Sequence, residues 1–86
     1  MTPIKIYTTR FCPYCLMAKR LLQHKQAAYE EIAVDDDRRL REEMMQRSGR
    51  RTVPQIWIGE RHIGGYDDLA ALDARGELDP LLTAGG

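Results

Sequence analysis

The sequence predicts an α/β fold in which one four-stranded mixed sheet carries helices on both faces. Three observations lead to this prediction: short apolar runs of strand length, intervening segments with helical spacing, and turn residues between them. The elements follow in the order β-α-β-α-β-β-α. Because the chain has 86 residues, 43% of them hydrophobic, we expect a single globular domain spanning residues 1–86.

The first β-α-β unit occupies roughly the first 34 residues. Residues 3–8 alternate as a strand does, with Ile4 and Ile6 on one face. A helix should follow from Pro13, which suits the first helical position, to about Lys25. Its expected apolar face consists of Tyr14, Met17, Ala18, Leu21 and Leu22. Residues 29–34 form the next strand, which should run parallel to the first through a right-handed crossover.

In the middle of the chain, the sequence predicts a short helix followed by a strand. The acidic run 35–37 is interpreted as a turn and an N-cap for a helix that carries Leu40 and Met44. The pair Ser48-Gly49 should end that helix. Residues 53–58 then form the third strand.

A hairpin and a third helix complete the predicted fold. Gly59-Glu60 is a two-residue turn into a return strand at 61–63. After Gly64-Gly65, Asp67 or Asp68 caps a helix that ends at Gly76. A short final turn should start at Asp79-Pro80.

Composition and charge exclude several classes of function. The 13 basic and 13 acidic residues balance, so neither a nucleic acid nor a membrane surface is an expected partner. No apolar run approaches the ~18 residues of a membrane helix, and the N-terminus lacks a signal-peptide pattern. We therefore expect a cytoplasmic protein, in which a cysteine pair is redox-active or metal-binding rather than structural.

Cys12 and Cys15, the only two cysteines, form a Cys-x-x-Cys motif at a predicted strand-to-helix junction. Residues three apart on a helix have Cβ atoms about 5–6 Å apart, close to disulfide reach. The helix start favours the thiolate of Cys12, and such motifs can have a pKa well below the free value of about 8.5. We expect Cys12 to attack and Cys15 to resolve the mixed disulfide.

Two simpler interpretations of the cysteine pair remain open. A zinc site needs about four ligands, and beyond the cysteines the chain offers only His24 and His62, at unhelpful separations, so we expect no metal. A chance pair without chemistry is the other interpretation.

Three segments together resemble the glutaredoxin family. They are residues 12–15 (CPYC), 52–56 (TVPQI) and 64–69 (GGYDDL), and their order and spacing match those of the short bacterial dithiol members. The resemblance spans nearly the whole chain and implies a thioredoxin-like fold. It also implies a cis peptide bond before Pro54. In place of the lysine that many members carry before the first cysteine, this chain has Thr9, followed by Arg10.

The resemblance implies a set of glutathione-binding residues around the catalytic Cys12 and Cys15. The Val53 backbone would pair with the cysteinyl backbone of glutathione, as an added strand does. The start of the third helix would hold the γ-glutamyl carboxylate, and Asp68 its ammonium. Simple helix capping and a plain strand start remain the alternatives for these segments. The full expected set is Tyr14, Arg41, Thr52, Val53, Pro54, Gly65, Tyr66, Asp67 and Asp68.

The implied function is a glutathione-dependent thiol-disulfide oxidoreductase. It would act as a monomer on disulfide-containing or glutathionylated proteins, with ribonucleotide reductase among the candidates. Glutathione would be a co-substrate, and no cofactor would be tightly bound. Two alternatives stay open: a hydrogen donor reduced by thioredoxin reductase, and a module that binds an iron–sulfur cluster through Cys12 and glutathione.

Overall fold

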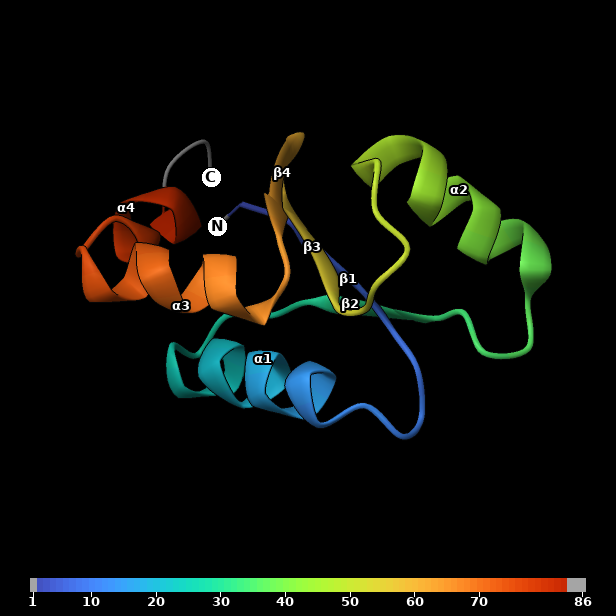
Figure 1. Ribbon diagram of the computed structural model, residues 1–86. Coiled ribbons are helices and arrows are strands. Elements are labelled where there is room, and N and C mark those ends of the chain that lie inside the picture. The colour runs from blue at the N-terminus through green and yellow to red at the C-terminus, as the bar shows by residue number, and fades with distance from the viewer. Residues whose placement is uncertain (1, 84–86) are drawn as a thin grey trace.

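The computed structural model describes residues 2–83. They form a four-stranded sheet, with the strand order β2-β1-β3-β4, and the helices that pack on it (Figure 1). β1 and β2 pair in parallel, whereas β3 pairs antiparallel with both β1 and β4. The predicted four-stranded mixed sheet is therefore confirmed. The strands are β1 (Ile4–Thr8), β2 (Glu30–Ala33), β3 (Gln55–Ile58) and β4 (Arg61–Gly64).

Helices cover both faces of the sheet, as predicted (Figure 1). α1 (Pro13–His24) and α3 (Tyr66–Ala74) pack on one face together with α4 (Leu78–Thr83), and α2 (Arg38–Ser48) lies on the other. The alternation along β1 divides the core accordingly. Ile4 and Ile6 belong to the apolar cluster of α1, α3 and α4, whereas Tyr7 belongs to the cluster under α2.

The two ends of α2 and the turn between β3 and β4 lie where the sequence predicted them. The carboxylate of Asp37 accepts a hydrogen bond from the Leu40 amide at 3.1 Å and so caps α2. Gly49 ends the same helix with a left-handed backbone, at φ 72°. Ile58 pairs with Arg61 across the two-residue turn that links β3 and β4. These caps fix the positions of the loops that carry the functional side chains.

The predicted inward face of α1 was partly wrong. Tyr14 and Met17 are exposed, and the buried stripe is Cys15, Ala18 and Leu22. Cys15 and Ala18 are small, so this side of the helix can approach the sheet more closely than the side bearing Tyr14 could. The consequence is functional, because the second cysteine lies in the core and Tyr14 is free to contact a ligand.

Several element boundaries differ from the prediction by one or two residues, among them the starts of β3 and of the last helix. β3 begins at Gln55 rather than at residue 53, and the peptide bond between Val53 and Pro54 is cis. The cis bond implied by the family resemblance is confirmed. The last helix begins at Leu78, one residue before the expected Asp79 cap, because Leu78 is buried in the core.

Candidate active site

The two cysteines lie at the start of α1. Cys12 is the N-cap residue with an extended backbone, and Pro13 occupies the first helical turn. The amide of Cys15 points at the Sγ atom of Cys12, at 3.1 Å. A sulfur in this position receives a backbone donor and the positive end of the helix dipole, and both favour a thiolate.

The two sulfur atoms differ sharply in access. They lie at disulfide-bonding distance, with Cα atoms 5.1 Å apart. Cys15 is 1% exposed, whereas Cys12 is only partly buried. This difference in access fits the expected roles, in which Cys12 attacks and Cys15 resolves the mixed disulfide. The carbonyl oxygen of Val53 lies 3.7 Å from the Cys12 sulfur, which brings the loop before β3 beside the reactive atom.

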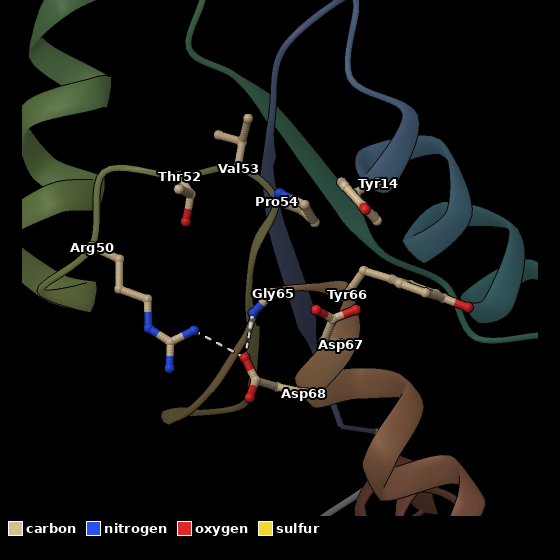
Figure 2. A pocket seen from close by; sticks show the side chains of 9 residues that line it. All are labelled: Tyr14, Arg50, Thr52, Val53, Pro54, Gly65, Tyr66, Asp67 and Asp68. Atoms are coloured by element: carbon tan, nitrogen blue, oxygen red, sulfur yellow. Dashed lines mark hydrogen bonds and ion pairs between the residues drawn. The ribbon is translucent and has the colours of Figure 1, made fainter.

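Val53 also lines a pocket of about 250 Å³, whose side chains Figure 2 shows. Three segments far apart in sequence form it: the start of α1, the loop before β3 and the start of α3. The rings of Tyr14 and Tyr66 stack at 6.4 Å along one side. The lining residues are Tyr14, Arg50, Thr52, Val53, Pro54, Gly65, Tyr66, Asp67 and Asp68.

Asp68 connects two other residues that line the pocket. Its Oδ2 atom accepts hydrogen bonds from the Gly65 amide and from Nη1 of Arg50, each at 2.9 Å (Figure 2). The first bond closes a capping arrangement at the start of α3. The Gly65 amide, and secondly the Arg50 guanidinium, hold the pKa of Asp68 below its usual value. Asp68 is therefore a carboxylate at neutral pH.

The structure brings together every predicted binding residue except Arg41. The Arg41 guanidinium instead donates to the carbonyl of Arg51 at 3.5 Å. Arg50, which lines the pocket, was not among the predicted residues. Its only sequence signal is its position just before the Thr52–Pro54 segment. The Ser48 hydroxyl exchanges hydrogen bonds with the Arg50 backbone, at 3.0 and 3.1 Å, and so fixes this loop.

Two basic residues close to Cys12 in the sequence, Arg10 and Lys19, pair with carboxylates. Arg10 contacts Asp35 through its backbone amide, at 2.7 Å, and through its side chain, at 3.4 Å. Lys19 pairs with Glu31 at 3.0 Å. The Arg10 amide lowers the pKa of Asp35, and the Thr8 hydroxyl, followed by Lys19, lowers that of Glu31. The polar contacts of the Cys12 sulfur are thus with the backbone, at the Cys15 amide and the Val53 carbonyl.

Among residues 2–83, no three side chains of His, Cys, Asp or Glu converge as a metal site would require. Each helix in the same range is too short or too polar to cross a lipid bilayer.

Comparisons with known proteins agree with this geometry. The family model for glutaredoxin matches residues 4–63. A glutaredoxin of Pseudomonas aeruginosa is 56% identical over 84 residues, which cover 98% of this chain and 100% of that protein. Glutaredoxin 3 of Escherichia coli K12 is 57% identical over 82 residues, covering 95% of this chain and 99% of the relative.

A solved structure shares the fold. A crystal structure of buckwheat glutaredoxin in complex with glutathione superimposes with a TM-score of 0.88 at 33% identity, and the match covers 95% of this chain and 77% of that one. Family, fold and the paired cysteines together define a thiol-disulfide oxidoreductase. The chain belongs to the glutaredoxin family.

Proposed function

We propose that the protein is a glutathione-dependent oxidoreductase that reduces protein disulfides and glutathionylated proteins. The observation that carries the proposal is the pocket beside the accessible Cys12 sulfur. A tripeptide bound in this pocket would lie along the loop of Val53 and the start of α3, with its own sulfur toward Cys12. The buckwheat relative, solved with glutathione, supports this choice of ligand.

The charges of the pocket suit the γ-glutamyl end of glutathione, which carries an ammonium and a carboxylate. The lowered pKa of Asp68 keeps its side chain a carboxylate, which can accept hydrogen bonds from the ammonium. The first amides of α3, at Tyr66 and Asp67, have no acceptor within the helix and can bind the carboxylate. Arg50, which now pairs with Asp68, offers a second partner for that carboxylate.

The main chain of Val53 provides the central contact. We propose that it hydrogen-bonds the cysteinyl residue of glutathione as a short added strand would. The sulfur of that residue then faces Cys12, because the Val53 carbonyl already lies 3.7 Å from the Cys12 sulfur. Thr52 and Pro54 flank this contact.

Deglutathionylation needs Cys12 alone. Its thiolate attacks the glutathione sulfur of the mixed disulfide, a Cys12–glutathione disulfide forms, and the protein leaves as a thiolate that takes up a proton. A second glutathione thiolate attacks the bound glutathione sulfur. Oxidised glutathione leaves, and the Cys12 thiolate is restored.

Reduction of a protein disulfide also uses Cys15. Cys12 attacks one sulfur of the substrate, and the thiolate of Cys15 then attacks the Cys12 sulfur and releases the reduced protein. The resulting Cys12–Cys15 disulfide is reduced by two glutathione molecules, the first attacking Cys12. Cys15 is buried, so an intramolecular attack is the step that its position allows.

The proposed setting is the cytoplasm, where glutathione keeps thiols reduced, and the proposed acting form is a monomer. The proposed protein partners carry disulfides or glutathionylated cysteines. Ribonucleotide reductase is one candidate to assay with the purified protein.

The test is turnover of the mixed disulfide of hydroxyethyl thiol and glutathione, coupled to glutathione reductase. We expect saturable NADPH oxidation that requires glutathione and is lost in Cys12→Ser. Turnover supported by thioredoxin reductase, with none from glutathione, would overturn the proposal.

A further inference from the structure

A buried polar side chain, Gln55, lies directly behind the pocket. It is 0% exposed, yet no buried side-chain nitrogen or oxygen among the described residues lacks a partner. Its Nε2 atom donates to the carbonyl oxygen of Thr52 at 3.0 Å and contacts the Thr52 hydroxyl at 3.3 Å. Its Oε1 atom lies 2.7 Å from Nε2 of His62. Gln55 therefore links His62, outside the pocket, to Thr52, which lines it.

The partners of Gln55 fix both the orientation of its amide and the tautomer of His62. Because the Thr52 carbonyl can only accept, Gln55 must present its nitrogen there and its oxygen to His62. His62 must then donate from Nε2. Without that donor, the buried Oε1 atom of Gln55 loses its hydrogen-bond partner, and the side chain is held only at its nitrogen end, by Thr52.

Packing holds the His62 ring in place for this bond. His62 and Trp57 are cross-strand partners in β4 and β3, and their ring centroids lie 4.7 Å apart. The Arg47 guanidinium lies over the Trp57 ring, at 5.2 Å. Burial, followed by the charge of Arg50, lowers the pKa of His62, so the ring is neutral at physiological pH. Nε2 carries a proton in that tautomer and in the cation alike.

We propose that His62 is a positioning residue for the thiol-disulfide reaction, which through Gln55 holds Thr52 and Val53 beside the Cys12 sulfur. The inference rests on the proposed glutathione function of the pocket, and it adds a residue that does not line that pocket. The contact from Gln55 reaches Thr52, the next residue is Val53, and the Val53 carbonyl lies 3.7 Å from the sulfur. A looser loop should weaken binding of the tripeptide without changing the Cys12 thiol.

Two variants of His62 separate the hydrogen bond from the packing. His62→Phe keeps a ring against Trp57 but has no donor, whereas His62→Gln keeps a donor at a similar reach but has no ring. Gln55→Met removes the link at its centre with a side chain of similar size, and covers the case in which His62→Phe does not fold. Thermal melts establish that each variant is folded.

The readouts are the KM for the mixed disulfide of hydroxyethyl thiol and glutathione, and the backbone order parameters of Thr52 and Val53 from NMR relaxation. We expect His62→Phe and Gln55→Met to raise KM about 3- to 10-fold, the size of one or two neutral hydrogen bonds. Their order parameters should fall from about 0.85 toward 0.6. His62→Gln should stay within about twofold of the native KM, and iodoacetamide should alkylate Cys12 at an unchanged rate throughout.

The two proposals fail in different ways. Unchanged KM and order parameters in His62→Phe and Gln55→Met, or equal losses in His62→Phe and His62→Gln, would overturn the positioning role. If the native protein shows no glutathione-dependent turnover, the proposed function is wrong, and the order parameters alone decide the role of His62.

Discussion

Gly64 precedes the pocket residue Gly65 and occupies a position that a residue with a side chain would fit poorly. Its φ is +117°, a conformation that side chains of L-residues rarely adopt. A Cβ atom placed there would overlap Oδ2 of Asp68, and it would lie 2.8 Å from Cγ of Asp68 and 3.0 Å from Nη1 of Arg50. Gly64→Ala must therefore strain the backbone and displace the Asp68 carboxylate.

Two terms set the size of the effect. Holding a non-glycine residue in a sparsely populated backbone region costs about 1–3 kcal/mol. Displacing Asp68 weakens its bonds to the Gly65 amide and Arg50, which adds about 1 kcal/mol at this partly exposed site. The expected loss of about 2–4 kcal/mol in the free energy of unfolding would lower Tm by roughly 10–25 °C for a domain of this size.

Urea denaturation of Gly64→Ala, with Gly76→Ala as the control, measures this loss. Gly76 also has a positive φ, +72°, but no atom lies within 4 Å of its added Cβ. The control should lose only about 1 kcal/mol. The mixed-disulfide assay should also show a higher KM for Gly64→Ala, because Asp68 has moved. Equal losses of stability in the two variants would refute the reasoning about steric overlap.

Three further predictions concern the cysteines, the pocket carboxylate and a helix cap. Cys15→Ser should retain reduction of a glutathionylated substrate and lose reduction of a protein disulfide, whereas Cys12→Ser should lose both; insulin reduction and the mixed-disulfide assay separate them. Because the folded-state pKa of Asp68 is lowered, its carboxylate stabilises the fold above its unfolded value of about 3.9, and this contribution disappears as pH falls through the folded value. The difference in Tm between the native protein and Asp68→Asn should therefore shrink between pH 7 and pH 3; a constant difference would contradict the assignment. Asp37→Ala should cost about 1 kcal/mol of unfolding free energy through loss of the α2 cap, measured in urea.

The sequence was most informative where local chemistry decides the structure. Asp37 and Gly49 marked the ends of α2, because capping depends on one or two neighbouring residues. The cysteine motif likewise indicated a pair within disulfide reach. The pocket itself required the family resemblance, since nothing local in the residues around Pro54 or Gly65 says that they meet.

Where tertiary packing decides, prediction from the sequence was weaker. The i, i+3 and i+4 spacing on α1 fits two neighbouring faces, and only packing against the sheet selects the one with Ala18 and Leu22. Arg50 could not be assigned to the pocket, because its partner Asp68 lies 18 positions away in the sequence. The hydrogen bonds from His62 through Gln55 to Thr52 could not be predicted either, because they depend on the pairing of β3 with β4.

The central claim is that a cysteine at the tip of α1 is held as a reactive thiolate beside a site for glutathione. The most direct measurement is the rate of iodoacetamide alkylation of Cys12 in reduced Cys15→Ser, followed across pH with and without S-methylglutathione. We predict a half-maximal rate well below the pH of about 8.5 typical of free cysteine, and saturable protection by the tripeptide. Alkylation that follows free cysteine, with no protection at any concentration, would contradict the account.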